Sequence, residues 1–332
     1  MSAPLLEVEN LEVRFPVKRG GPFSPPDWLH AVDDVSFAIP KGETLAVVGE
    51  SGSGKTTAAH AVARLVAAQG GRVRLGGEDL LPLEGAALRQ ARARLQIIFQ
   101  DPYSSLNPRL RVDAIVREPM DSLTDMSEAE KSAALERLFA AVGLRPEQRR
   151  LFPHQFSGGQ RQRIGIARAL ATRPELVICD EPVSALDVAV QAQILNLLRR
   201  LQAEFGLTYL FISHDLGVVQ HMSDRIAVMY MGKIVEVAPR MALFSLPLHP
   251  YTAALISAVP SVDRRRRAAV KRILIPGDPP DPMNRPEGCR FAGRCPAAEA
   301  RCRAEEPPLK PLEGGRSVAC WLAEGGEPPV RV

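Results

Sequence analysis

The chain has 332 residues, of which 45% are hydrophobic and 24% are charged, and its formal net charge is +4. This composition is typical of a soluble globular protein and excludes an intrinsically disordered chain. The length allows one large domain or two smaller ones, and the mild basic excess suits a membrane surface or a polyphosphate ligand without demanding either. No apolar run approaches the roughly 18–20 residues that cross a bilayer, and the N-terminus lacks a signal-peptide pattern, so we expect a cytoplasmic protein.

The first 40 residues predict short β-strands on either side of a loop. Residues 5–9 and 11–15 have strand character, and residues 31–39 resume it. Residues 16–29 are rich in Pro and contain two adjacent Gly, which predicts an extended loop between the strands.

The next segment predicts a phosphate-binding loop between a strand and a helix. Residues 44–48 form a hydrophobic run typical of a buried strand, and residues 57–68, rich in Ala and free of Gly and Pro, predict a helix. Between them, residues 49–56 fit G-x-x-x-x-G-K-[ST]. The glycines let backbone N–H groups converge on an anion, and the helix N-terminus adds partial positive charge. The expected binding residues are Gly49, Glu50, Ser51, Gly52, Ser53, Gly54, Lys55, Thr56 and Thr57.

Two side chains of this loop have specific predicted tasks. Lys55 is expected to reach the β- and γ-phosphates of a nucleotide, and the Thr56 hydroxyl is expected to ligate Mg²⁺. The alternative is a Gly-rich turn that binds nothing, which the strand–loop–helix context disfavours. An aromatic ring in the N-terminal segment could stack on adenine. Phe15 is our first candidate and Trp28 the second, and the alternative is that both are ordinary core or loop aromatics.

Further along, strands and helices alternate. Residues 72–83 predict a hairpin around Gly76 and Gly77, residues 95–99 a strand, and residues 106–170 a mostly helical region in which helix 128–142 stops at Gly143. Residues 175–180 and 208–213 predict buried strands on either side of an amphipathic helix over residues 187–204. A hairpin over residues 225–237 turns at Gly232.

Two carboxylates follow the apolar strand at residues 176–179. Asp180 at the strand tip is predicted to hold Mg²⁺ opposite Thr56. Glu181 is predicted to orient and deprotonate an attacking water. An apolar strand ending in two acids is weak evidence alone, and it becomes informative because a phosphate-binding loop precedes it.

A Gly-rich helix start gives the first specific family resemblance. Phe156 is followed by Ser157, Gly158, Gly159 and Gln160, and this segment resembles the signature sequence of ABC-type ATPases, with Phe in place of the usual Leu. The resemblance implies that the Ser and the second Gly contact the γ-phosphate bound to the loop of an opposite subunit. A Ser hydroxyl, glycine amides and a helix N-terminus do make an anion site. The alternative is a serine helix cap.

The remaining motifs of that family follow in order along residues 5–240. Gln100 resembles the Q-loop glutamine, which reaches Mg²⁺ and the water; residues 184–187, ending in Asp187, resemble the D-loop at the dimer interface. His214 resembles the switch histidine that senses the γ-phosphate. The implied fold is α/β: a P-loop NTPase ABC cassette with a mixed core sheet, an antiparallel β subdomain and a helical subdomain at about residues 101–170.

A narrower resemblance covers three more segments. Residues 99–109, 248–252 and 288–296 are similar to ATPase subunits of oligopeptide and dipeptide importers. Composition shifts after residue 258, where Pro becomes frequent. We therefore expect a nucleotide-binding domain at residues 1–258 and a loop-rich, Cys-containing extension at residues 259–332. The run Arg264–Arg267 predicts a solvated surface, with anionic lipid contact as the alternative.

Four of the five cysteines lie in the extension: Cys289, Cys295, Cys302 and Cys320. The resemblance implies a [4Fe–4S] cluster held by this set, and four thiolates suit either Fe–S or zinc. Reduced cysteines without metal are the third alternative. Cys179 has a simpler interpretation as a small buried hydrophobe, and we assign it no chemistry.

The resemblance also implies partners. One phosphate-binding loop and one signature segment per chain imply a head-to-tail pair of cassettes that clamps ATP, with a second ABC ATPase subunit as the expected mate. Two transmembrane permease subunits and an extracytoplasmic solute-binding protein would complete an importer, with this chain peripheral on the cytoplasmic face of the inner membrane. The cargo stays open among peptides, nickel chelates and other small solutes. A soluble ABC ATPase acting on nucleic acid or the ribosome, and a P-loop kinase or GTPase, are the disfavoured rivals, so we expect no nucleic acid partner.

Overall fold

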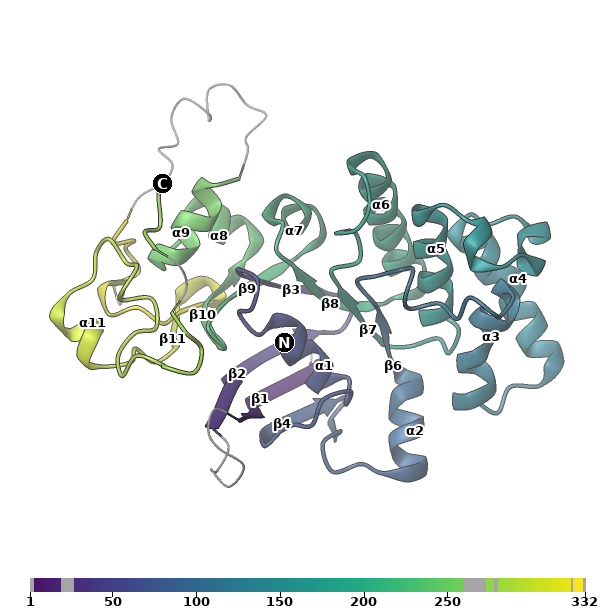
Figure 1. Cartoon of the computed structure of the whole chain (residues 1–332), viewed down its shortest axis with the longest axis horizontal. Helices are drawn as coiled ribbons and strands as arrows, with labels where there is room; N and C mark the ends of the chain where they lie inside the picture. Colours follow the sequence, from purple (N-terminus) through teal and green to yellow (C-terminus); the bar gives the residue numbers. More distant parts are fainter. Residues whose placement is uncertain (1–2, 19–26, 260–272, 278–279, 324, 331–332) are drawn as a thin grey trace.

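The computed structural model describes residues 3–18, 27–259, 273–277, 280–323 and 325–330. Its centre is an eight-stranded sheet, with a helical region at one end and the C-terminal extension at the other (Figure 1). The strand order of this sheet is β11 (Lys310–Leu312), β12 (Arg316–Val318), β10 (Lys233–Pro239), β9 (Arg225–Tyr230), β3 (Thr44–Val48), β8 (Thr208–Ser213), β7 (Leu176–Asp180) and β6 (Leu95–Ile98).

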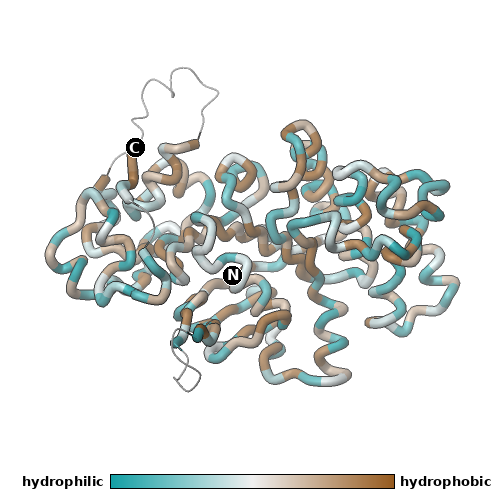
Figure 2. Tube along the Cα trace, viewed as in Figure 1, coloured by the Kyte–Doolittle hydropathy of each residue, from teal (hydrophilic) through white to brown (hydrophobic). Residues whose placement is uncertain are grey.

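The middle of the sheet is parallel and largely buried. β9, β3, β8, β7 and β6 run parallel, and every residue of β3, β7 and β8 is buried. Figure 2 shows the hydrophobic colouring concentrated along these strands. Strands covered on both faces are continuous hydrophobic runs, which is why the sequence predicted them well.

A second, four-stranded sheet packs beside α1 (Lys55–Val62), in the order β2 (Asp27–Pro40), β1 (Pro4–Val17), β4 (Gly70–Leu75) and β5 (Glu78–Asp79). The hairpin expected around Gly76 and Gly77 is confirmed as β4–β5. The loop expected over residues 16–29 is too long. Phe15 pairs with Leu29 and Pro16 with Trp28, so both strands extend into that segment, and residues 19–26 lie outside the described residues. Cross-strand pairing outweighed the local Pro signal here.

The helix expected over residues 57–68 ends early, at Val62. Arg64 adopts a left-handed backbone with φ of 56°, and its guanidinium donates to the carbonyls of Leu80 and Leu81. These carbonyls belong to the turn after β5, so a tertiary contact stops a segment whose helix propensity would have continued.

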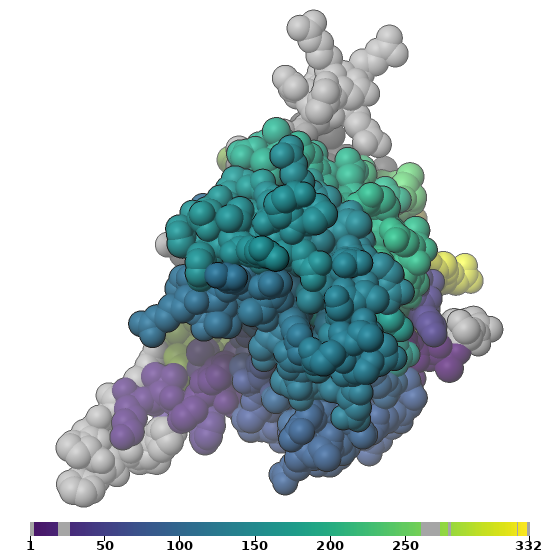
Figure 3. All heavy atoms as spheres, turned by 90° about the vertical axis from the view of Figure 1, so that its right-hand side faces the viewer, coloured from purple at the N-terminus to yellow at the C-terminus, as the bar shows by residue number. Residues whose placement is uncertain are grey.

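The helical region comprises α3 (Val112–Leu123), α4 (Glu128–Val142) and α5 (Gly158–Ala169). Ser127 and Glu130 form a capping box at the start of α4, and Gly143, with φ of 72°, ends it as expected. Figure 3 looks at the molecule from this end, where the teal residues of these helices cover the upper face above the blue residues around α2 (Gly85–Arg94). The sequence did not predict α2.

Among the described residues, the C-terminal half of the chain contributes the helices α6 (Val188–Phe205), α7 (Leu216–Met222), α8 (Arg240–Ser245), α9 (Pro250–Ser257) and α11 (Ala300–Ala304). α6 packs against α5 of the helical region, whereas α8 packs against β9 and β10 toward the other end of the sheet. β12 pairs antiparallel with β10, so residues of the extension continue the main sheet. The segment Arg264–Arg267 lies outside the described residues. Among the helices that are described, none is both long enough and apolar enough to span a bilayer.

Candidate nucleotide-binding site

The predicted motif residues meet at one edge of the main sheet. The loop at residues 49–56 follows β3, Asp180 ends β7, His214 follows β8, and Gln100 follows β6. Because these four strands are parallel, their carboxyl ends lie along the same edge, which is where ligands bind in open α/β sheets. Motifs spread over more than 160 residues of sequence are brought together by topology alone.

The phosphate-binding loop is held by contacts that leave no room for larger residues. A Cβ on Gly54, whose φ is 99°, would lie 2.2 Å from the carbonyl oxygen of Ala31. A Cβ on Gly49 would lie 2.1 Å from the carbonyl oxygen of Met229. Glycine at these two positions is therefore a steric requirement of the loop.

Lys55 is buried at the mouth of the loop, with a relative exposure of 5%. Its ammonium donates to the carbonyls of Gly49 at 2.9 Å and Glu50 at 2.8 Å. Burial lowers the pKa of Lys55 below its ordinary value, and the carboxylates of Glu181, Asp180 and Glu50 oppose that shift. Three nearby carboxylates thus favour a charged ammonium at the point where phosphates are expected.

Asp180 and Thr56 face one another across the edge. Thr56 Oγ1 donates to Asp180 Oδ1 at 2.9 Å, and Asp180 is 3% exposed. The other carboxylate oxygen, Oδ2, lies 3.0 Å from His60 Nε2. A hydroxyl and a carboxylate in contact are oxygen ligands of the kind that Mg²⁺ prefers, so these residues fit that ion.

Glu181 lies between Gln100 and His214. Gln100 Nε2 donates to Glu181 Oε2 at 3.0 Å, and His214 Nδ1 lies 3.0 Å from Glu181 Oε1. Glu181 has a left-handed backbone, with φ of 44°, and its N–H donates to the carbonyl of Ile212. A strained non-glycine conformation of this kind is characteristic of functional sites, because the surroundings must enforce it.

The signature segment is held by hydrogen bonds between its own residues. Ser157 caps α5: its Oγ accepts from the N–H of Gln160 at 3.4 Å, and its own N–H donates to Gln160 Oε1 at 3.0 Å. A Cβ on Gly159 would lie 2.5 Å from Val190 Cγ1 on α6, and Gly158 approaches Leu186. No hydrogen bond among the described residues joins this segment to the phosphate-binding loop of the same chain.

Asp187 caps α6 and lies next to Leu186 in the sequence, three residues before Val190. Its Oδ1 accepts from the N–H of Val190 at 3.0 Å at the start of α6. The signature and D-loop segments are thus packed together through Val190 and Leu186.

The two candidate adenine-stacking rings lie on neighbouring strands. Phe15 and Trp28 are exposed, at 36% and 49%. Phe15 is directly opposite Leu29 in the pairing, and Trp28 is opposite Pro16. Since adjacent residues of a strand point to opposite faces, Phe15 and Trp28 project from opposite faces of this sheet, so at most one of them faces a given nucleotide.

The four cysteines of the extension line one small cavity, together with apolar and aromatic side chains such as Phe291 and Trp321. Burial raises the pKa of Cys289 and of Cys320 to about 11, and neighbouring cysteines add to both shifts. As the side chains stand, the described residues contain no group of three or more His, Cys, Asp or Glu that could hold a metal ion. Cys179 is fully buried on β7, and burial raises its pKa, as expected for an inert thiol.

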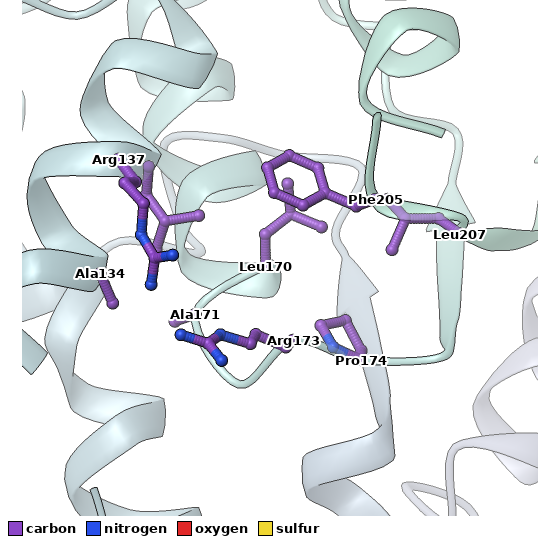
Figure 4. A pocket seen from close by; sticks show the side chains of 9 residues that line it. Ala134, Arg137, Leu170, Ala171, Arg173, Pro174, Phe205 and Leu207 are labelled. Carbon is purple, nitrogen blue, oxygen red and sulfur yellow. The ribbon is translucent and has the colours of Figure 1, made fainter. Parts of the chain in front are cut away.

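A cavity of about 320 Å³ opens elsewhere, between α4, the end of α5 and the end of α6. Figure 4 shows the guanidinium groups of Arg137 and Arg173 on one side and the side chains of Phe205 and Leu207 on the other. None of the predicted site residues lines it, so its size says nothing about the nucleotide site.

Sequence reasoning missed three residues at the site: His60, Tyr251 and Arg294. His60 was detectable, because it lies four positions after Thr56 and therefore on the same face of α1. Tyr251 and Arg294 come from the distant C-terminal third and contact Glu50. Their segments had been recognised by resemblance, but nothing in them indicated contact with the loop.

The fold and the site together define a P-loop ATPase cassette, with the predicted phosphate-binding loop after β3 and an acid pair at the end of β7. The family model for ABC transporters matches residues 32–184. A second model, for the C-terminal region of oligopeptide/dipeptide transporters, matches residues 235–302.

Named relatives extend over almost the whole chain. A probable peptide ABC transporter ATP-binding protein of Sinorhizobium fredii is 51% identical over 97% of this chain and 91% of its own length. The oligopeptide transport ATP-binding protein AppF of Bacillus subtilis is 47% identical over 96% and 97%. The dipeptide transport ATP-binding protein DppF of Escherichia coli is 45% identical over 100% and 98%. The chain belongs to the ATP-binding proteins of oligopeptide/dipeptide-type ABC transporters and is an ATPase.

Solved structures agree with the cassette fold. The ATP-binding cassette MJ0796, in a dimeric post-hydrolysis state bound to ADP and Pi, is 26% identical and has a TM-score of 0.63, covering 71% of this chain and 98% of that one. A second dimeric structure of the same cassette is 27% identical, with a TM-score of 0.62 and the same coverage. The expected class of an ABC cassette with mixed sheet, antiparallel β region and helical region is confirmed.

Proposed function

We propose that the chain is the ATP-hydrolysing subunit of an importer that takes up peptides through a membrane permease. The observation that carries this proposal is the position of Glu181, held between Gln100 and His214 at the edge where the phosphate-binding loop ends. The relatives named above are peptide, oligopeptide and dipeptide transport proteins, which supports the cargo class. Import of nickel or another small solute by the same machinery is the alternative.

Each residue of the edge has a proposed task in hydrolysis. Residues 49–57 bind the phosphates through backbone N–H groups, and Lys55 neutralises the β- and γ-phosphates. Thr56, Asp180 and Gln100 would hold Mg²⁺, which when bound neutralises charge on the phosphate oxygens. Glu181 accepts a proton from the attacking water, and Gln100 fixes the orientation of its carboxylate. His214 contacts the other oxygen of that carboxylate, and its exposed side chain has the proposed task of sensing the γ-phosphate.

A complete ATP site in this proposal needs two cassettes. Ser157 and Gln160 hydrogen-bond to each other. No hydrogen bond among the described residues joins the segment Ser157, Gly158, Gly159 and Gln160 to the phosphate-binding loop of its own chain, which supports the use of this segment on the loop of a partner. Asp187 would lie at the same junction. A second, different ABC ATPase subunit is the proposed mate, so that hydrolysis removes the phosphate held by both halves and the pair opens.

The remaining partners follow from the importer class. We propose two transmembrane permease subunits, an extracytoplasmic solute-binding protein and a peripheral position on the cytoplasmic face of the inner membrane. We further propose a nucleotide-binding domain at residues 1–258, with its helical subdomain at about residues 101–170, and an importer-type extension at residues 259–332. Phe15 is the proposed adenine-stacking ring, with Trp28 as its rival.

The cysteines of the extension form a separate part of the proposal. Four thiols around one cavity have the donor chemistry of a [4Fe–4S] or zinc site, although their present arrangement contains no metal-binding group among the described residues. We propose the cluster, with zinc and metal-free cysteines as alternatives. Iron, sulfide and zinc analysis after anaerobic purification separates the three outcomes, and a Cys302→Ser variant should lose whichever metal is bound.

The function is tested by association and by transport. With hydrolysis blocked by Glu181→Gln, MgATP should drive crosslinking between this chain and its mate, whereas ADP should not. Vesicles that contain the complete transporter should take up a labelled peptide only when ATP is on the side of this chain. Association that is independent of ATP would contradict the proposal that two cassettes bind ATP between them. Uptake of a nickel chelate but not of peptides would show that the cargo is not a peptide.

A further inference from the structure

Residues of the C-terminal third contact the phosphate-binding loop at Glu50. Arg294 forms a two-pronged ion pair with Glu50, with Nη1 at 3.0 Å from Oε2 and Nη2 at 3.4 Å from Oε1. The backbone N–H of Glu50 donates to the hydroxyl of Tyr251 at 2.8 Å. Glu50 is the second residue of the loop, so both its side chain and its backbone are held by residues more than 200 positions away.

These contacts are partly buried, and further contacts hold Tyr251 and Arg294 in place. Tyr251 is fully buried on α9, and Arg294 is 8% exposed. Arg294 Nη1 also donates to the hydroxyl of Tyr230 at 3.3 Å. The rings of Tyr230, Tyr251 and Phe291 pack together, with centroids 4.7 to 5.4 Å apart. Rigid aromatic packing of this kind fixes where the guanidinium and the hydroxyl stand.

The negative charge of Glu50 explains why its contacts with Arg294 and Tyr251 matter for nucleotide binding. A carboxylate in a loop that binds a triphosphate repels its ligand, and Arg294 neutralises that charge at short range. The carbonyl of Glu50 meanwhile accepts from the ammonium of Lys55. Movement of Glu50 would therefore displace its carboxylate charge and also the carbonyl that accepts a hydrogen bond from Lys55.

We propose that Arg294 is a positioning residue for ATP binding, which together with Tyr251 fixes Glu50 and thereby holds the phosphate-binding loop in its binding conformation. The C-terminal extension is then part of the construction of the nucleotide site. This inference rests on the proposed role of residues 49–57 in binding phosphate.

Arg290 provides a matched control within the same segment. It is 6% exposed, as buried as Arg294, and it also ties the extension to the cassette. Its guanidinium contacts Asp33 on β2, Glu306 and the carbonyl of Met231, and it has no contact with Glu50. Loss of Arg290 should therefore disturb the attachment of the extension without exposing the charge of Glu50.

The test is a set of ATP titrations on the full chain. Arg294→Met should raise the Kd for MgATP about tenfold, since it leaves the carboxylate of Glu50 unpaired beside the phosphates. Arg290→Met should change the Kd by less than about twofold. The KM for ATP should rise in Arg294→Met while kcat at saturating ATP stays near wild type, because Arg294 touches no reacting group. Melting curves establish that each variant is folded.

A double variant distinguishes positioning from simple structural damage. Glu50→Gln removes the charge that Arg294 neutralises, so adding Arg294→Met to it should raise the Kd by less than about threefold. Tyr251→Phe keeps the ring and removes only the acceptor for the Glu50 N–H, and it should raise the Kd about threefold even if Arg294→Met fails to fold. Equal effects of Arg294→Met with and without Glu50→Gln, or equal effects of Arg290→Met and Arg294→Met, would overturn the proposal.

The result for Lys55→Ala separates this inference from the function on which it rests. If Lys55→Ala loses ATP while Arg294→Met binds it normally, only the positioning role of Arg294 is wrong. If Lys55→Ala itself binds ATP with wild-type affinity, the phosphate-binding assignment fails and the inference fails with it.

Discussion

The nucleotide-binding edge of the sheet and the C-terminal extension are built in different ways. At the edge, Gln100 and His214 follow β6 and β8 and Asp180 ends β7, and the parallel register of these strands brings the three residues together. The described part of the extension has short elements, such as β11 and β12 with three residues each, and it is attached through buried arginines and an added strand pair. Single substitutions at the edge should therefore lower ATPase activity. Single substitutions in the extension should instead lower the stability of the protein or disturb the geometry of the phosphate-binding loop.

The largest expected effect belongs to the edge. Glu181→Gln should lower kcat by about 10²- to 10⁴-fold, because the amide cannot accept the proton of the attacking water. ATP binding and ATP-driven association should remain, since the side chain keeps its size. The matched control is Glu175→Gln, the same change just before the other end of β7, where Glu175 pairs with Arg94. Phosphate release assays at saturating ATP measure both, and wild-type turnover in Glu181→Gln would refute the role of that carboxylate.

The next effect concerns affinity at the same edge. Lys55→Ala should raise the Kd for MgATP by about ten- to a hundredfold, which corresponds to about 1.4–2.8 kcal/mol. The reason is that a buried ammonium, surrounded by the carboxylates of Glu181, Asp180 and Glu50, is lost from the phosphate site. Calorimetric titration is the measurement, and Lys41→Ala, at an exposed turn before β3, is the control. Unchanged affinity in Lys55→Ala would contradict the phosphate-binding interpretation.

A third prediction moves to the attachment of the extension. Arg316 Nη2 donates to the fully buried Glu236 at 3.0 Å, and Glu236 also accepts the N–H groups of Leu248 and His249. Arg316→Met should lower the free energy of unfolding by roughly 2–4 kcal/mol, because a buried carboxylate loses its cation. Urea unfolding at pH 7 measures this.

Arg117→Met is the matched control for that change. Arg117 pairs with Asp121 and Glu128 on the exposed surface of the helical region, where an ion pair contributes at most about 1 kcal/mol. If both arginine variants lost the same stability, the buried pair at Glu236 would not be a special anchor of the extension.

The smallest effect is a pH dependence at Asp33. Burial raises the pKa of Asp33, but hydrogen bonding to Arg290 and the charges of Arg290, Lys233 and Arg285 outweigh burial and hold it below its ordinary value of 3.8. The unfolded chain therefore binds a proton at a higher pH than the folded chain, so this contribution is present at neutral pH and is lost as pH falls below about 4. Asp33→Asn should be less stable at pH 7 and should show a shallower loss between pH 5 and pH 3. Urea midpoints across this range test it, and identical slopes would contradict it.

Local sequence predicted the edge because each of its parts is a continuous motif. The strand over residues 208–213 has the expected bounds, and β3 and β7 agree with expectation to within a residue. His60 could have been added from helical spacing alone. The predicted bounds failed where distant parts intervened, as at Arg64, where carbonyls of the turn after β5 end α1 early.

The sequence by itself determined the ATPase class, the strand–loop–helix that carries the phosphate-binding residues, and the residues that gather at the carboxyl edge. It could do so because hydrophobic runs, glycines and strand-end carboxylates act through neighbours in the chain. Only the tertiary structure decided that Arg294 and Tyr251 hold Glu50, that Arg290 and Arg316 meet Asp33 and Glu236, and that four cysteines surround one cavity. Those contacts join residues far apart in sequence, and their energy depends on burial and distance, which a linear pattern does not contain.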